Sequence, residues 1–130
     1  MKILLVGEIN FDIVLKGHSA VPVPGREVLV DDFTMTLGSS CAITGAGLVR
    51  LGNEASYRGK TGDDPGGRFC LEKMAALGLD VSHVELDPAL KTGVTVSLTS
   101  STDRSLISYL GATTALTSGE VRDELFEGFR

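Results

Sequence analysis

The feature that most constrains the fold is an alternation of strand-like and helix-like segments along the first two thirds of the chain. Residues 3–6 form a continuous apolar run closed by Gly7, which is typical of a strand buried on both faces of a parallel sheet. The segments that follow a later loop are, in order, a helix over 40–51, a strand over 55–59, a helix over 65–77 and a strand over 81–86. This order predicts an α/β fold with a mostly parallel sheet.

The expected helices have recognisable ends. Ser39 or Ser40 can cap the first helix, because a hydroxyl accepts a hydrogen bond from a free N–H of the first turn. Asp64 caps the second helix and Pro65 occupies its first position, where the missing N–H costs nothing. A third helix is predicted to begin near residue 118, because Thr117 and Glu120 have the spacing of a capping box.

A second set of strands has a different pattern, in which apolar residues alternate with Thr, Ser and charged residues. Such strands expose one face to solvent. They are expected at 12–16, at 27–37 with a bulge near residues 31 and 32, and as a hairpin over 92–110 that turns at 100–103; a loop is expected at 21–25. The two groups, approximately 12–37 and 92–110, predict a small separate sheet that covers one edge of the parallel sheet.

Length and charge exclude several classes of protein. A chain of 130 residues with 42% apolar and 22% charged residues is one globular domain. Its net charge of −5 argues against general nucleic-acid binding. Two isolated cysteines make neither a zinc site nor a disulfide framework. No apolar run is long enough to span a membrane. We therefore expect a cytoplasmic protein without a metal site, nucleic acid or membrane partner.

The first candidate site lies directly after the first buried strand, at Asn10 and Asp12. Ligands of open α/β sheets bind at the carboxyl ends of strands. Residues two apart in an extended chain point to the same side, so an amide and a carboxylate can bridge adjacent hydroxyls of a polyol. The alternative is that Asn10 satisfies a turn and Asp12 is a solvated strand end.

Two further segments carry glycine and hydroxyl groups. Residues 37–43 lead into a helix, whose free N–H groups can donate hydrogen bonds to anions or sugar oxygens, although ordinary capping explains the same residues. Residues 61–67 could cradle a phosphate, but their two carboxylates favour a plain strand-to-helix turn. The sequence contains neither a dinucleotide-binding fingerprint nor a Walker loop.

Taken in order, these segments resemble the ribokinase (PfkB) family of carbohydrate kinases. Residues 7–12 look like the family's opening G-x-x-N-x-D, and residues 24–27 look like its P-G-E turn. Residues 38–52 and 62–67 occupy the places of its glycine-rich helix start and of its G-x-D-x-x-G. Leu77–Val81, Thr92–Val94, Asp103–Arg104 and Gly111–Ala112 follow at familiar spacings. The resemblance covers nearly the whole chain.

The resemblance implies a fold and an activity. The chain would be the N-terminal part of a three-layer, ribokinase-like α/β domain, with the small sheet as a lid over the sugar and a surface for a second subunit. The full-length enzyme would pass the γ-phosphate of ATP to a sugar or nucleoside hydroxyl, with Mg²⁺. The base, the phosphate-binding loop and the metal site would lie beyond Arg130, so that the chain alone is inactive and binds no cofactor tightly.

The resemblance also assigns residues by position. The substrate-binding set would be Asn10, Asp12, Gly38, Ser39, Ser40, Ile43 and Arg104. The family usually has a second glycine where Ser39 stands and an Asn where Ile43 stands, so the bound sugar or the loop differs here. Two other readings stay open: a sugar-binding or regulatory protein without catalysis, and a structural fragment without a ligand.

Overall fold

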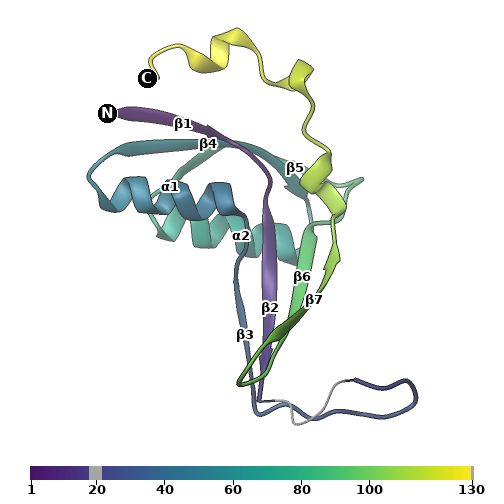
Figure 1. Ribbon diagram of the computed structural model, residues 1–130. Helices are drawn as coiled ribbons and strands as arrows, with labels where there is room; N and C mark the ends of the chain where they lie inside the picture. Colours follow the sequence, from purple (N-terminus) through teal and green to yellow (C-terminus); the bar gives the residue numbers. More distant parts are fainter. Residues whose placement is uncertain (18–21, 130) are drawn as a thin grey trace.

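The computed structural model describes residues 1–17 and 22–129, which form two β-sheets, two α-helices and three short 3₁₀ turns (Figure 1). The first sheet has three parallel strands in the order β1-β4-β5, with the bounds Lys2–Val6, Glu54–Gly62 and Asp80–Asp87. Helix α1 (Ser40–Arg50) leads into β4, and helix α2 (Pro65–Ala76) connects β4 to β5. The predicted α/β fold with a parallel sheet is therefore confirmed.

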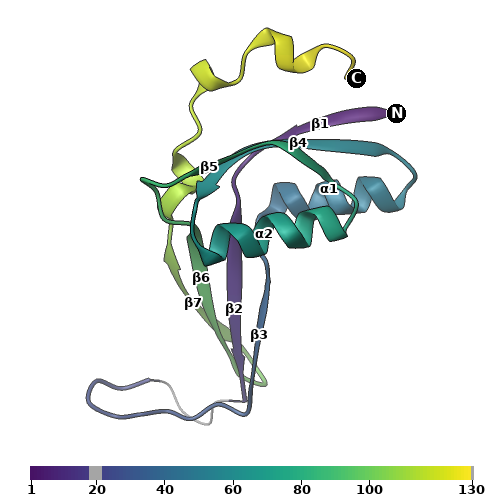
Figure 2. The same ribbon diagram turned by 180° about the vertical axis from the view of Figure 1, so that it is seen from behind.

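Both helices lie on the same face of the three-stranded sheet (Figures 1 and 2). Alternate residues of β1 and β4, among them Leu5 and Tyr57, point to this face and pack against Ala42 of α1 and Met74 of α2. Tyr57 and Met74 are completely buried. Within the described residues the helices form one layer, and the C-terminal segment, yellow in Figure 1, passes over the opposite face of the sheet.

The second sheet has four strands in the order β3-β2-β6-β7. Strand β2 (Asn10–Lys16) lies inside it, antiparallel to β3 (Asp32–Leu37) and parallel to β6 (Gly93–Thr99), and β7 (Arg104–Tyr109) completes a hairpin with β6. The separate small sheet is therefore confirmed, and Figure 1 shows it projecting from the layer of β1, β4 and β5.

The four-stranded sheet has two chemically different faces, because neighbouring residues of a strand point to opposite sides. We call the side of Asp12 the polar face; the register places hydroxyl side chains from the other three strands beside Asp12. We call the other side the apolar face, and its members include Phe11, Ile13, Phe33, Met35, Val96 and Ile107. At its base Phe11 packs edge-on against Phe69 of α2, with ring centroids 6.2 Å apart.

The strand expected over 27–37 is shorter than predicted. Regular pairing begins at Asp32, and before it a single backbone bond joins the Asp31 N–H to the Lys16 carbonyl at 2.9 Å. The partner strand β2 ends at Lys16 because Gly17 turns the chain at φ +80°. The predicted bulge is absent here, and the only irregular register among the described strand pairs lies between β4 and β5. Of the loop expected at 21–25, residue 21 lies outside the described residues, and the rest contains a turn.

The helix predicted from residue 118 is wrong. The chain forms the 3₁₀ turns η1 (Gly111–Thr114), η2 (Ser118–Glu120) and η3 (Asp123–Phe126) instead. The capping box does exist: the Glu120 carboxylate accepts hydrogen bonds from the N–H and the hydroxyl of Thr117 at 2.8 and 2.7 Å. The turn does not continue, because glycines at 119 and 128 disfavour helix and a helix of about 12 residues is marginal without packing.

Candidate functional site

The structure brings Asn10 and Asp12 together with the start of α1. The Asn10 amide oxygen accepts a hydrogen bond from the Ser39 N–H at 2.7 Å. This bond orients the amide, so that its nitrogen donates to Oδ1 of Asp12 at 3.2 Å. Asn10 is thus already held at both ends of its amide group. Its clearest role is to orient Asp12, whose Oδ2 receives no hydrogen bond from any described residue and can bind a ligand.

Gly38 is required at this position for a steric reason. It follows β3 and lies beside Asn10, whose carbonyl accepts its N–H at 2.9 Å. A Cβ at residue 38 would overlap the Asn10 amide nitrogen and would lie 2.8 Å from Oδ1 of Asp12. Gly93 flanks Asn10 on the other side, in β6. Glycine on both sides of Asn10 therefore leaves room for close packing around its side chain. Gly38, which the family resemblance placed in the site, lies directly beside Asn10 and Asp12.

The carboxyl group of Asp12 is partly buried, and this changes its chemistry. Burial raises the pKa of Asp12, and the positive charge of Arg104 acts in the opposite direction. A partly desolvated carboxylate gains more from a hydrogen bond than a solvated one does, because water no longer competes for it. Asp12 is therefore suited to accept a hydroxyl hydrogen of a ligand that excludes water from the site.

Ser39 connects four elements at the site. Its N–H donates to Asn10, its hydroxyl donates to the Glu8 carbonyl at 2.7 Å, and the same oxygen accepts the Ala42 N–H at 3.1 Å as the cap of α1. The residue adopts φ +50°, which costs a non-glycine residue conformational energy. Ser39 is only 7% exposed, so it stabilises the loop rather than presenting its hydroxyl to a ligand.

Tyr57 and Glu8 are the residues that sequence reasoning missed. The Tyr57 hydroxyl donates to the Glu8 carbonyl at 2.7 Å and lies 3.3 Å from Oγ of Ser39. Burial raises the pKa of Tyr57, and the side chain is fully buried. Glu8 lies inside the opening motif at residues 7–12, which could have identified it. No local sequence signal indicates Tyr57, which is brought to the site by the pairing of β1 with β4.

The other predicted residues lie further from Asp12. Ser40 is exposed, and its hydroxyl donates to the Glu8 carboxylate at 3.3 Å. Ile43 is 59% exposed, one turn into α1, and contributes no polar group to the network. Arg104 lies on the polar face and pairs with Thr99, four residues beyond the partner of Asp12. Its backbone is therefore about 13 Å from that of Asp12 along the sheet, but its charge still acts to lower the pKa of Asp12. The structure groups Asn10, Asp12, Gly38 and Ser39, with Arg104 on the same face further along the sheet.

The turn at residues 61–67 is filled by internal hydrogen bonds. The Asp64 carboxylate accepts the Gly67 N–H at 2.8 Å, the Thr92 N–H at 2.8 Å and the Thr92 hydroxyl at 2.7 Å. Burial acts to raise the pKa of Asp64, but these bonds outweigh it and lower the pKa. Asp64 thus ties the start of α2 to the start of β6, as the interpretation of this segment as a structural turn predicts.

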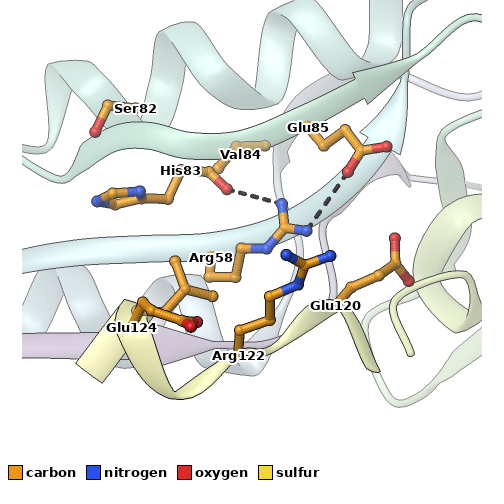
Figure 3. Close-up of a pocket in the computed structure, with 9 residues that line it drawn as sticks. Arg58, Ser82, His83, Val84, Glu85, Glu120, Arg122 and Glu124 are labelled. Carbon is orange, nitrogen blue, oxygen red and sulfur yellow. Dashed lines mark hydrogen bonds and ion pairs between the residues drawn. The ribbon is translucent and has the colours of Figure 1, made fainter. Parts of the chain in front are cut away.

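A cavity of about 670 Å³ lies elsewhere, between strands β4 and β5 and the C-terminal segment (Figure 3). Arg58 crosses it, donating to the His83 carbonyl at 3.0 Å and to the Glu85 carboxylate at 3.4 Å. None of the predicted site residues lines it. Its charged lining residues are Arg58, Arg122, Glu85, Glu120 and Glu124, and both Glu85 and Glu120 form ion pairs with Lys60.

The described part of the chain has no metal-binding cluster and no membrane-spanning helix. No three His, Cys, Asp or Glu side chains in residues 1–17 and 22–129 gather closely enough to hold a metal ion. No helix in that part of the chain is long and apolar enough to cross a membrane. The arrangement around Asp12 can orient a hydroxyl by hydrogen bonding.

Comparison with known proteins identifies the family. A family model described as pfkB family carbohydrate kinase matches residues 1–128. A fructokinase of Klebsiella pneumoniae is 38% identical over 59 residues, which are 45% of this chain and 19% of that protein. A 5-dehydro-2-deoxygluconokinase of Clostridium perfringens is 33% identical over 110 residues, 77% of this chain and 32% of that protein. The chain spans a third or less of the length of these relatives.

Solved structures show the same fold at lower sequence identity. A PfkB protein from Polaromonas superposes over 100% of this chain and 43% of its own, with a TM-score of 0.85 and 22% identity. The ribokinase of Arabidopsis thaliana, solved with ribose and ATP, covers 89% of this chain and 38% of its own, with a TM-score of 0.81 and 22% identity. The predicted ribokinase-like fold class is confirmed. Because the family model matches almost every residue, the chain belongs to the pfkB family of carbohydrate kinases.

Proposed function

We propose that this chain supplies the sugar-binding half of an enzyme that transfers the γ-phosphate of ATP to a sugar or nucleoside hydroxyl. The observation that carries the proposal is Asp12: a partly buried carboxylate near the start of β2, oriented through Asn10, with a free oxygen. A carboxylate in this position binds the substrate hydroxyls and holds the acceptor hydroxyl in place. The four-stranded sheet serves as the lid that excludes water.

The nucleotide half of the reaction requires residues outside this chain. Phosphoryl transfer needs a cradle for the phosphates, metal ions that offset their charge and a base that orients the nucleophile. The described residues do not fit Mg²⁺-ATP, because they contain neither a metal-ligand cluster nor a phosphate loop of a known kind. We assign no contact with ATP or Mg²⁺ to this chain, and we place the base in the remainder of a longer protein of the length of its relatives.

The first prediction separates the chain from that longer protein. The longer protein is expected to phosphorylate at least one of ribose, fructose, 2-keto-3-deoxygluconate and adenosine with ATP and Mg²⁺, as measured by coupled ADP release. The purified 130-residue chain is expected to give no signal above a heat-killed control, since we place the base outside it. Turnover by the chain alone would disprove the placement of the base. Sugar binding by the longer protein without any turnover would favour the non-catalytic alternative.

We also propose that the lid pairs two subunits through the apolar face. Phe33, Met35 and Ile107 on that face are 64%, 41% and 65% exposed, and apolar side chains gathered on one sheet face mark an interaction surface. Strands β3 and β7 leave open edges on either side of the same sheet, which also favours pairing. A second copy of the chain fits because its surface is equally apolar.

We also propose a cytoplasmic location, because Cys41 and Cys70 are both free thiols.

The second prediction uses two neighbouring residues of β7 that point to opposite faces of the lid. Ile107→Asp places a charge on the apolar face and is expected to convert a dimer to a monomer at micromolar concentration in light scattering. Leu106→Asp is the matched control, because Leu106 lies on the polar face and is 54% exposed; it should leave the dimer intact. A wild-type longer protein that is monomeric under these conditions, or equal effects of the two variants, would contradict the pairing.

A further inference from the structure

The start of helix α2 contacts two strands of the lid, β2 and β6 (Figures 1 and 2). The contact with β6 is made by Asp64. Its carboxylate accepts both protons that Thr92 can donate, from the N–H at 2.8 Å and from the hydroxyl at 2.7 Å. Thr92 is buried and directly precedes β6. Because two hydrogen bonds to one carboxylate fix the orientation of a group as well as its position, Asp64 holds the start of β6 against α2.

Asp64 is itself fixed in the layer of β1, β4 and β5 with its helices. Its Oδ1 also accepts the N–H of Gly67 at 2.8 Å, which caps α2. The chain around it is closely packed, since a Cβ on Gly62, the last residue of β4, would lie 2.7 Å from the Thr92 nitrogen and 2.9 Å from Oδ2 of Asp64. The Thr92 hydroxyl gives its one proton to Asp64, so it accepts the proton of the Thr61 hydroxyl, whose oxygen lies 3.1 Å away. Thr92 therefore cannot shift unless β4 or α2 moves with it.

Both contacts of α2 with the lid end next to Asn10. The residue after Thr92 is Gly93, which pairs with Asn10, and a Cβ on Gly93 would lie 3.3 Å from Cβ of Asn10. The residue after Asn10 is Phe11, whose ring lies so close to the first turn of α2 that a Cβ on Gly66 would overlap it. Because Asn10 orients the carboxylate that we assign to the substrate, a shift of either strand would displace that carboxylate from its binding position.

We propose that Asp64 is a positioning residue for the sugar site, which holds the start of β6 in place and, through it, the orientation of Asp12. The inference rests on the proposed function, in which Asp12 binds substrate hydroxyls, and it gives a task to a residue outside the substrate-binding set. The link runs through Thr92 and Gly93 to Asn10, each of which contacts the next. The task requires a carboxylate, because an amide has one acceptor oxygen and would bring its NH₂ group against the N–H of Thr92.

Asp64→Asn in the longer protein tests this link. Asn caps a helix as well as Asp does, so with its oxygen in the place of Oδ1 the bonds from Gly67 and from the Thr92 hydroxyl are kept, and the bond from the Thr92 N–H is lost. Sugar affinity is measured by calorimetry with D-fructose and D-ribose as probes. For the sugar that binds better, affinity is expected to fall about 10-fold, the lower value for a charge-assisted hydrogen bond, because a displaced carboxylate still binds.

Asp80→Asn is the matched control for Asp64→Asn. The Asp80 carboxylate also accepts one backbone N–H and one hydroxyl, from Ser82 at 3.0 Å and from Ser56 at 2.9 Å. It lies at the start of β5, at the opposite end of the parallel sheet from Gly62. Its substitution removes a comparable structural carboxylate and should leave sugar affinity unchanged.

A double variant separates positioning from a general loosening of the fold. If Asp64 acts through Asp12, Asp64→Asn should add less than about 2-fold to the loss caused by Asp12→Ala, because the group to be positioned is already absent. Independent effects would multiply instead. Thr92→Val, which loses the hydroxyl bond and keeps the N–H bond, should show part of the loss, and Thr92→Ser, which keeps both, should bind as the wild type does.

Each result decides for or against the inference. Multiplied losses in the double variant, or equal effects of Asp64→Asn and Asp80→Asn, would overturn it. If Asp64→Asn does not fold, equal affinities of Thr92→Val and Thr92→Ser would do the same. If Asp12→Ala weakens binding and Asp64→Asn does not, the positioning role fails and the sugar site stands. If neither sugar binds the wild type, or Asp12→Ala has no effect, the proposed function and the inference fail together.

Discussion

Replacing Asp12 with Ala in the longer protein is expected to weaken sugar binding about 10- to 150-fold, the equivalent of ~1.5–3 kcal/mol for a charge-assisted hydrogen bond to a hydroxyl. The loss of affinity should lie at the upper end of this range. Asn10 would keep its orientation, but its amide nitrogen would no longer have an acceptor for its hydrogen bond. Turnover should fall together with binding, since a mobile acceptor hydroxyl is poorly aligned for transfer. Calorimetry and initial rates of phosphorylation measure the two effects separately.

Asp32→Ala is the matched control for Asp12→Ala. Asp32 is an exposed carboxylate on the same sheet, paired with Lys16 at the far end of β2, so its removal should leave sugar affinity unchanged. A pH series adds a second check. Because burial raises the pKa of Asp12 above its ordinary value of 3.8, binding on acidification should begin to weaken at a higher pH than for a solvated carboxyl. Equal affinities of wild type and Asp12→Ala would remove Asp12 from the site.

Gly67→Ala is expected to lower the free energy of unfolding by ~3 kcal/mol, the upper range for forcing an extra methyl group into packed structure. Gly67 lies in the first turn of α2, where a Cβ would overlap the Gly62 carbonyl oxygen and would lie 3.0 Å from Oγ1 of Thr92. A backbone carbonyl cannot move aside as a flexible side chain can. The substitution would also displace the Gly67 N–H from Asp64, which caps the helix.

Gly47→Ala serves as the comparison for Gly67→Ala, because both glycines are helical. A Cβ on Gly47 in α1 meets no atom within 4 Å, so alanine should stabilise the protein by up to ~1 kcal/mol through its better helix propensity. Urea unfolding followed by circular dichroism gives both values. Effects of the same sign in the two variants would contradict the argument that close backbone approach, rather than helix propensity, requires glycine at position 67.

Much of the fold followed from local patterns. The buried strands, both helices and their caps were predictable because apolar periodicity, Asp64–Pro65 and the glycines after each helix are local signals. Gly52 and Gly78 indeed adopt φ +85° and +89° after α1 and α2. The short 3₁₀ turns that stand where a helix was predicted from residue 118 could not be foreseen, because the capping box at Thr117 indicates how a turn begins and not how far it continues. The segment over 27–31 has a strand pattern but no partner strand to pair with.

The candidate site was predictable only in part, for a related reason. The spacing of Asn10 and Asp12 placed both side chains on one side, and the structure agrees. That spacing could not show that Asn10 is committed to the Ser39 N–H, since the bond joins residues 29 positions apart. Tyr57 could not be identified from the sequence for the same reason. Its hydroxyl contacts Glu8, 49 positions away, only because the strands pair. Long-range contacts of this kind turn a pair of polar residues into an oriented site.

The parallel pairing of β2 with β6 has a consequence for how the protein folds during synthesis. The paired residues, such as Asn10 and Gly93, lie about 80 residues apart along the chain, so closing this contact is slow. The sheet of β1, β4 and β5 with its two helices is complete once β5 has left the ribosome, whereas β2 must then wait for β6. Until β6 is made, β2 has an unpaired edge, and such an edge makes a nascent chain prone to aggregation. We expect this stretch of translation, rather than the finished molecule, to be where the protein depends most on chaperones.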